Sequence, residues 1–178
     1  MGLGFSAADA ERWIPRLRRY AFALTGTREG ADDLTQDTLE RAWRKRALWR
    51  PDSDLRAWLF TVMHNVFVNG VRAARPVESL DDERFGVDSG QAQTAANAAE
   101  SQLALAEIRT AFGRLSNEHR EVLSLVGVEQ MSYAEAAAVL EVPIGTVMSR
   151  LARAREQLRR LLSPEGSAAA TPALRRVK

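Results

Sequence analysis

The chain has 178 residues, a formal net charge of +2 and a hydrophobic content of 46%, which suits one domain or two small ones. It has no cysteine, which excludes disulfides, thiolate chemistry and cysteine zinc sites and fits a cytoplasmic protein. No apolar run approaches the roughly 20 residues of a membrane span, and the N-terminus lacks a signal-peptide layout, so we expect no membrane insertion. Two isolated histidines, no nucleophile–base pair and no phosphate-binding loop argue against an enzyme, a metal site or a cofactor.

The net charge is divided into three blocks along the chain. Residues 1–75 carry a formal charge of +4, residues 76–101 carry −5 and residues 102–178 carry +3. The middle block lacks sustained apolar periodicity and is rich in Ser, Asp, Gln, Ala and Gly, so we expect a flexible acidic linker over 76–101. The basic lobes on either side indicate two surfaces for a polyanion, and residues 163–178 are expected to form a flexible tail.

We expect the first lobe, residues 1–75, to be entirely helical. An amphipathic stripe over Trp13–Leu24 predicts a helix that ends at Gly26, with Pro15 either in its first turn or at a kink. A second helix should run from about Gly30 to Leu48. Its charges are acidic toward the N-terminus and basic toward the end, which is the order that complements the helix dipole.

The third predicted helix has the strongest apolar pattern in the chain. It follows the connector Trp49–Ser53, with Asp52 or Ser53 as its N-cap, and its apolar stripe covers Leu55–Phe67. The opposite face is polar and carries Thr61, His64, Asn65, Asn69 and Arg72. Asparagine is a poor helix former, so two of them one turn apart on an exposed face indicate either polar contacts to bases or unselected surface drift.

The second lobe, residues 102–162, contains a predicted helix-turn-helix. Ser132 and Glu135 have capping-box spacing, which predicts a helix over Tyr133–Leu140, and Pro143 lies near the start of the next helix. That next helix has an apolar stripe of Val147, Leu151, Ala154, Leu158 and Leu161. Its opposite face carries Thr146, Ser149, Ala152, Arg153 and Arg160, which suits approach to phosphates and base edges. The alternative is an ordinary helical hairpin with a solvated basic face.

Three segments together resemble the extracytoplasmic-function sigma factors, members of the bacterial primary-sigma family that direct RNA polymerase to promoters. They are residues 32–43 (DDLTQDTLERAW), residues 55–60 (LRAWLF) with Asn65, and residues 145–151 (GTVMSRL). The resemblance covers about residues 10–75 and 102–162, with the motifs in the family's order. It implies an all-α fold in which two small helical domains, sigma region 2 and sigma region 4 with its helix-turn-helix, are joined by the flexible acidic linker.

For the first lobe, the resemblance implies binding to a coiled coil of the polymerase β′ subunit and opening of the −10 promoter element. The residues expected at the core-polymerase contact are Asp33, Leu34, Gln36, Asp37, Leu39 and Arg41. Those expected at the −10 DNA are Trp49, Thr61, Asn65, Asn69 and Arg72. An aromatic ring in a proline-containing loop suits capture of an unstacked base, although Trp49 serves equally well as a core anchor. Trp43 and Trp58 lie on apolar stripes and are expected in the core.

For the second lobe, the resemblance implies binding to the −35 element as duplex DNA and to the polymerase β flap. The residues expected at the −35 DNA are Thr146, Met148, Ser149, Arg150, Arg153 and Arg155. Many members of the family have Lys or Arg where this chain has Met148, which can touch a thymine methyl but cannot make a bidentate guanine contact. Direct readout therefore falls on Thr146, Ser149 and Arg153, while Arg150 and Arg155 are assigned to phosphates or intramolecular pairs.

The distance between the two promoter elements constrains the linker. About 25 base pairs span roughly 85 Å, whereas a flexible linker of this length has a typical end-to-end distance of about 28 Å. We therefore hypothesise that core polymerase must hold the lobes apart, and that the free lobes can fold together. The resemblance also implies an anti-sigma factor as a regulatory partner.

Two alternative functions are retained at this stage. One is a sigma-like decoy that binds an anti-sigma factor without touching DNA, although such a protein would not need Arg150, Arg153 and Arg155. The other is a stand-alone helix-turn-helix repressor, which would leave the first lobe unexplained.

Overall fold

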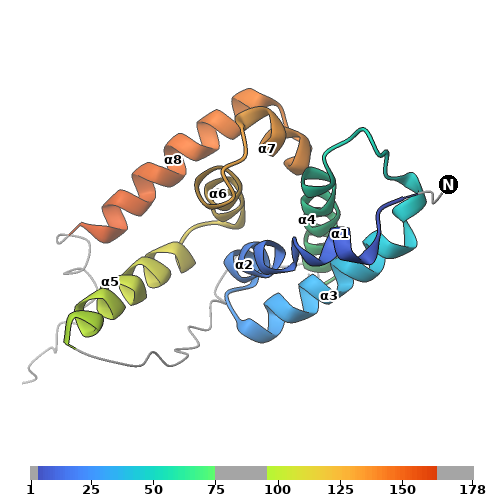
Figure 1. Ribbon diagram of the computed structural model, residues 1–178. Coiled ribbons are helices and arrows are strands. Elements are labelled where there is room, and N and C mark those ends of the chain that lie inside the picture. Colours follow the sequence, from blue (N-terminus) through green and yellow to red (C-terminus); the bar gives the residue numbers. More distant parts are fainter. Residues whose placement is uncertain (1–3, 75–95, 164–178) are drawn as a thin grey trace, which may run out of the picture.

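The computed structural model describes residues 4–74 and 96–163, with side chains described up to 72 and from 105 onward, and every regular element in these ranges is helical (Figure 1). The elements are α1 (Ala7–Glu11), α2 (Ile14–Thr25), α3 (Arg28–Arg44), η1 (Arg46–Leu48), α4 (Leu55–Ala74), α5 (Ala96–Gly113), α6 (Asn117–Val122), η2 (Leu123–Val128), α7 (Tyr133–Leu140) and α8 (Ile144–Leu162). The all-α prediction is confirmed. None of the helices described is long and apolar enough to cross a membrane.

In the first lobe, α2 and α3 form a helical hairpin around Gly26. Gly26 adopts a φ of 77°, which favours glycine, and it ends α2 at the position predicted from sequence. The Thr27 hydroxyl then caps α3 by accepting a hydrogen bond from the amide of Gly30 at 3.1 Å. The helix α3 ends at Arg44, earlier than expected, and a short 3₁₀ turn, η1, covers the rest of the predicted range.

Two features at the ends of the first lobe differ from expectation. Ser6 and Asp9 form a capping box that starts α1, a helix the apolar pattern did not indicate. At the start of α4, the cap is Asp54 and not Asp52 or Ser53. The Asp54 carboxylate accepts a hydrogen bond from the Arg56 amide at 2.8 Å, as an N-cap side chain does.

The second lobe begins with α5, whose first residues fall inside the range expected to be linker. Residues 96–101 are helical, and their alanine-rich sequence explains this because alanine has the highest helix propensity. The remainder of the expected linker and the expected tail lie outside the described residues. Ser116 caps α6, and Ser132 and Glu135 form the predicted capping box at the start of α7.

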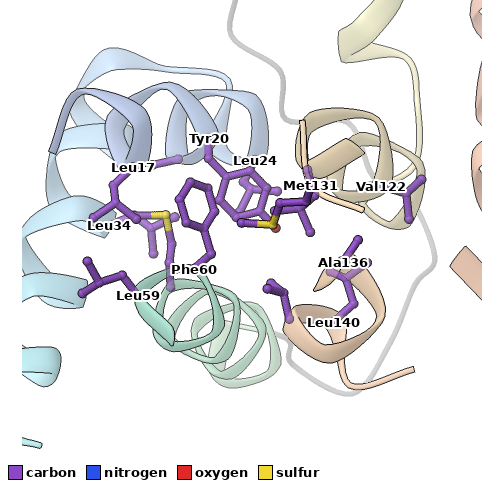
Figure 2. Close-up of a cluster of buried hydrophobic side chains, with 14 of the residues drawn as sticks. Leu17, Tyr20, Leu24, Leu34, Leu59, Phe60, Val122, Met131, Ala136 and Leu140 are labelled. Carbon is purple, nitrogen blue, oxygen red and sulfur yellow. The ribbon is translucent and has the colours of Figure 1, made fainter. Parts of the chain in front are cut away.

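The two lobes share one hydrophobic core. Leu17, Tyr20, Leu24 and Phe60 of the first lobe lie in the same buried cluster as Val122, Met131, Ala136 and Leu140 of the second (Figure 2). In Figure 1, α4 stands beside α7, and α2 lies against α6. The chain therefore has a closed arrangement in which the second lobe packs on the first through apolar side chains. Burial of such side chains is the main favourable term in association.

Candidate nucleic-acid interface

The helix-turn-helix is formed by α7 and α8. Val139 and Leu140 of α7 are buried, as are Val147 and Leu151 on the facing side of α8. The turn between the helices depends on Glu141, which ends α7 with a φ of 54°. This is a left-handed conformation that non-glycine residues adopt infrequently. Pro143 then occupies the N-cap of α8, where its missing amide hydrogen leaves no helical bond unmade.

The outward face of α8 carries most of the residues predicted to contact the −35 DNA. Met148 is 47% exposed, and Ser149, Arg153 and Arg155 are exposed as well, while Thr146 is half-buried. The Ser149 hydroxyl donates to the Thr146 carbonyl at 3.0 Å, which leaves the hydroxyl oxygen available as an acceptor. Arg150 differs from the others because its guanidinium forms an ion pair with Glu118 at 2.7 Å. Of the two roles expected for Arg150, a phosphate contact or an intramolecular pair, the structure therefore shows the intramolecular pair.

The polar face of α4, predicted to contact the −10 DNA, lies partly against the second lobe. Thr61 is half-buried, and its hydroxyl donates to the Ala57 carbonyl at 2.9 Å. The Asn65 amide donates to the Glu141 carboxylate at 3.2 Å, which is a contact between the lobes. Asn69 and Arg72, nearer the end of α4, are exposed. The structure therefore places Asn65 against the second lobe and leaves Asn69 and Arg72 open to solvent.

Trp49, the remaining predicted −10 residue, packs at the edge of the first lobe. Its ring centroid lies 5.9 Å from that of the buried Phe5 in an edge-on arrangement, and Trp58 lies 5.6 Å from the same ring. The Trp49 indole N–H is buried with no hydrogen-bond partner among the described residues. In the free chain Trp49 is thus a half-buried aromatic anchor, and Trp58 contacts the core as predicted.

The outer face of α3 carries the predicted core-polymerase residues, with one correction. Asp33, Gln36, Asp37 and Arg41 are exposed and Leu39 is half-buried. Leu34, however, is only 7% exposed and belongs to the core, so its predicted role as an exposed contact is wrong. The buried stripe of α3 contains Thr35 and Thr38, whose hydroxyls donate to carbonyls one turn earlier. Because these buried residues are polar, a search for apolar periodicity does not detect the stripe.

Trp43, expected in the core, is 45% exposed. Its ring lies beside the Arg46 guanidinium, whose carbon is 4.5 Å from the ring centroid. Together with the half-buried Leu39, Trp43 lines a shallow apolar hollow of about 360 Å³ between α1 and α3, whose other lining residues are Phe5, Ala7, Ala10, Glu11, Ile14, Glu40 and Ala42. An exposed tryptophan beside an apolar hollow is typical of a protein-contact surface.

Ion pairs across the boundary between the lobes were not predicted. Glu129, a buried residue with a side chain 0% exposed, receives hydrogen bonds from both Arg16 and Arg19. The closest atoms are Arg16 Nε and Glu129 Oε2 at 2.6 Å, and the second guanidinium nitrogen of Arg16 donates to the Glu129 carbonyl at 2.8 Å. In the sequence, Glu129 directly follows the largely apolar run 122–128, which indicates that its carboxylate is buried. A buried carboxylate requires a hydrogen-bonding or charged partner. No feature of the sequence indicated that Arg16 and Arg19 would be the partners of Glu129.

Two further carboxylates of the second lobe contact α4. Arg56 donates to Glu135 at 2.8 Å, and the ring nitrogen Nδ1 of His64 lies 3.2 Å from Glu121. The pKa of Glu135 is lowered, first by hydrogen bonds from the backbone and side chain of Ser132 and then by Arg56. Burial raises the pKa of Tyr20 well above its ordinary value, and the charge of Glu121 adds to this effect.

An apolar groove of about 430 Å³ opens between α2 of the first lobe and α5 and η2 of the second. Tyr20, Phe22, Leu105, Ile108, Phe112 and Val128 provide most of its apolar lining. Leu105, Ile108 and Val128 are all among the exposed large apolar side chains of the described residues. In those same parts of the chain, no group of three or more His, Cys, Asp or Glu side chains is placed to hold a metal ion.

Comparison with known proteins matches each lobe to a family. A family model described as the Sigma2 domain of PhyR matches residues 11–64, and one described as sigma-70, region 4, matches residues 105–158. The chain is 39% identical to the ECF RNA polymerase sigma factor EcfG of Rhodopseudomonas palustris over 156 residues, which cover 86% of this chain and 83% of the relative.

Solved structures extend the likeness to the arrangement of the helices. The sigma factor RpoE in complex with the anti-sigma factor NepR, from Bartonella quintana, matches with a TM-score of 0.66 and 32% identity, covering 87% of this chain and 94% of that one. CnrH in complex with the cytosolic domain of CnrY matches with a TM-score of 0.63 and 29% identity, covering 92% and 88%.

Proposed function

The chain belongs to the extracytoplasmic-function sigma factors of bacterial RNA polymerase. We propose that it directs promoter-specific initiation and that each of its two lobes binds a different promoter element and a different part of core polymerase. The second lobe binds the −35 element as duplex DNA and contacts the β flap. The first lobe binds the β′ coiled coil and opens the −10 element. The protein acts as an initiation factor and not as an enzyme, and it works in the cytoplasm, where bacterial core polymerase is found.

The single observation that carries this proposal is the exposed face of α8 in an intact helix-turn-helix. A recognition helix enters the major groove with its N-terminal residues toward base edges. Thr146, Ser149 and Arg153 supply hydrogen-bonding groups there, and the exposed Met148 supplies an apolar contact that suits a thymine methyl. Arg155 suits a phosphate. Arg150 reaches one only if it releases Glu118.

In the first lobe, the open part of α4 and the nearby tryptophan suit an unstacked DNA strand. Asn69 and Arg72 are exposed on α4, and Trp49 lies in the connector that precedes it. Stacking a base on an aromatic side chain contributes about 1–3 kcal/mol, which offsets part of the cost of unstacking. Trp49 would have to turn its ring away from Phe5 to provide that surface.

The core-polymerase contact is proposed on α3. The exposed Asp33, Gln36, Asp37 and Arg41 provide alternating charge and polarity that suits a partner helix. The half-buried Leu39, in the apolar hollow beside Trp43, adds the apolar component that a stable contact needs. The exposed Trp43 takes the role that sequence had given to Leu34.

An anti-sigma factor is the proposed regulatory partner, since the solved relative RpoE is held by NepR. We place that contact at the apolar groove between α2, α5 and η2. The groove is lined almost entirely by apolar groups, and both lobes contribute to it, so a segment bound there would hold the lobes in their closed arrangement.

The decoy function remains as a second candidate because the family model that matches the first lobe is that of PhyR. Arg153 and Arg155 weigh against it, since both are exposed on α8 and a protein that binds only an anti-sigma factor has no use for them.

Promoter binding with and without core polymerase tests the proposed function. We expect the chain alone to bind a promoter duplex weakly and the holoenzyme to bind it tightly and specifically. Equally tight specific binding by the chain alone would reject the requirement for core polymerase. Absence of specific binding by the holoenzyme would reject the sigma function itself.

A further inference from the structure

Arg150 differs in its surroundings from the other two arginines predicted to contact the −35 DNA. All three lie in the described part of α8, where Arg153 and Arg155 are exposed and the Arg150 side chain is only 21% exposed. The Arg150 guanidinium donates to the carboxylate of Glu118, on α6, at 2.7 Å. Because α6 packs against α8, this ion pair holds the arginine at the junction of the two helices.

The position of Arg150 along α8 would otherwise suit a DNA contact. It lies four residues after Thr146 and three before Arg153, so these three residues share one side of the helix. Thr146 and Arg153 are the residues proposed to read base edges. An arginine therefore stands beside the proposed base contacts with its charge already paired inside the protein.

Glu118 is suited to compete with a phosphate for that arginine. Its side chain is 60% exposed and lies in the first turn of α6, where the helix dipole favours a negative charge. Carboxylate and phosphate oxygens accept the same charge-assisted hydrogen bonds from a guanidinium. If Arg150 turned to a phosphate, the Glu118 charge would lose its partner and would remain close to the DNA, where like charges repel.

We propose that Glu118 limits the affinity of the second lobe for duplex DNA by withholding Arg150 from the phosphate backbone. This inference rests on the proposed role of α8 at the −35 element and adds a residue that itself makes no DNA contact. Phosphate contacts carry no sequence information, so the loss of one weakens binding to promoter and to random duplexes alike. Glu118 therefore makes the second lobe more dependent on core polymerase for stable promoter binding.

The experiment measures how tightly variants of the full-length chain, assembled with core polymerase, bind a fluorescent duplex. The probe is the −35 duplex of a promoter that this holoenzyme transcribes, and Kd is measured over a series of salt concentrations. Glu118→Ala, Arg150→Ala and the double variant complete a mutant cycle with the wild type. The matched control is Glu107→Ala, which removes an exposed carboxylate from α5 of the same lobe.

We expect Glu118→Ala to bind the duplex about five to ten times more tightly than the wild type near 0.1 M salt. The slope of log affinity against log salt should steepen by about 0.9, the value for one added phosphate contact. A purely structural role of the ion pair would not steepen this slope. Arg150→Ala should leave the slope unchanged, the double variant should lose the gain, and Glu107→Ala should bind like the wild type.

Glu118→Gln provides a second variant in case Glu118→Ala perturbs α6. It keeps a neutral acceptor for Arg150, and neutral hydrogen bonds are roughly half as strong as charge-assisted ones, so it should show part of the gain. Circular dichroism verifies that each variant is folded.

Three results would overturn the inference. One is equal or weaker duplex binding by both Glu118 variants. Another is a gain that persists in the double variant, since it would come from lost repulsion and not from Arg150. The third is a shallower salt slope for Arg150→Ala, which would mean that the wild-type arginine already contacts a phosphate.

Arg153→Ala distinguishes failure of this inference from failure of the proposed function. If Arg153→Ala weakens duplex binding while the Glu118 variants do not change it, α8 binds the −35 element and only the role of Glu118 is wrong. If Arg153→Ala binds the duplex as the wild type does, the proposed role of the α8 face is wrong as well.

Discussion

The Glu129 carboxylate and the Arg16 guanidinium, 113 positions apart in the sequence, lie 2.6 Å from each other at the boundary between the two lobes. The Glu129 side chain is fully buried, and Arg16 also donates to the Glu129 backbone carbonyl. A buried carboxylate without such partners is strongly disfavoured. The pair therefore joins region 4 to region 2 at one defined position and fixes how the closed chain is arranged.

Arg16→Ala should lower the free energy of unfolding by about 1.5–3 kcal/mol, since hydrogen bonds to a charged group contribute about that much. Arg19 would remain as a partner and limit the loss. Urea unfolding followed by circular dichroism measures the change. Arg12→Ala, which removes an exposed ion pair with Asp9, should change stability far less, because solvent-exposed ion pairs contribute little. Equal losses in the free energy of unfolding for the two variants would mean that the buried Glu129 ion pairs stabilise the chain no more than an exposed ion pair does.

Acid should weaken the contribution of Glu135 to stability. Its pKa in the folded chain is lowered from the ordinary value of 4.5. The contribution is therefore complete above about that value and is lost as the pH falls through the lower folded value. Glu135→Gln keeps the capping-box geometry without the charge. We expect the wild type to be more stable than this variant at neutral pH, with the difference shrinking as the pH falls below about 4.5. A difference that is constant with pH would contradict this.

Arg153→Ala should weaken holoenzyme binding to the −35 element by about 1–3 kcal/mol. Because Arg153 is exposed on α8, its removal should leave folding and core binding unchanged. Fluorescence anisotropy with duplex DNA measures the loss, and Arg114→Ala, an exposed arginine before α6, is the matched control. Loss of core binding by Arg153→Ala would show that this face of α8 contacts protein and not DNA.

Met148→Arg should change which −35 sequences are preferred. Arginine can make the bidentate guanine contact that methionine cannot, and one such contact is worth about 1–3 kcal/mol of discrimination. Selection from a randomised −35 library should therefore show a new preference for guanine at one position. An unchanged selection would place Met148 away from the bases.

Leu34 and Asp37 should separate folding from core binding on α3. Leu34→Ala creates a cavity in the core and should cost about 2–5 kcal/mol of stability. Asp37→Ala, at an exposed position, should leave stability within about 0.5 kcal/mol and weaken binding to core polymerase. Thermal unfolding and a core-binding assay measure the two effects. The assignment of the α3 surface fails if Asp37→Ala binds core polymerase normally.

Local signals in the sequence were sufficient to predict most of the helices. Gly26 ended α2, the Ser132–Glu135 capping box started α7, and Pro143 preceded α8, because each acts on the backbone within a turn of its own position. Burial was harder to predict. Leu34 is in the core and Trp43 is exposed, since the buried stripe of α3 contains threonines and does not follow the most apolar residues.

The contacts between the lobes could not be predicted from sequence. Arg16 with Glu129, Arg56 with Glu135 and Asn65 with Glu141 join residues 76–113 positions apart. No periodicity or motif indicates which distant charge a side chain will meet. The polar side of α4, which remains the candidate −10 face, could be predicted from the helical pattern, but its partial coverage by the second lobe required the structure.

Run-off transcription with purified core polymerase tests the central claim, that this chain directs promoter-specific initiation through both lobes. Templates would be genomic fragments from the organism that carries the chain. We predict discrete transcripts that require the chain, diminish with Arg153→Ala and disappear when the −10 element of the template is replaced. Absence of transcripts from every template, together with tight binding to an anti-sigma factor, would contradict the claim and favour the decoy function.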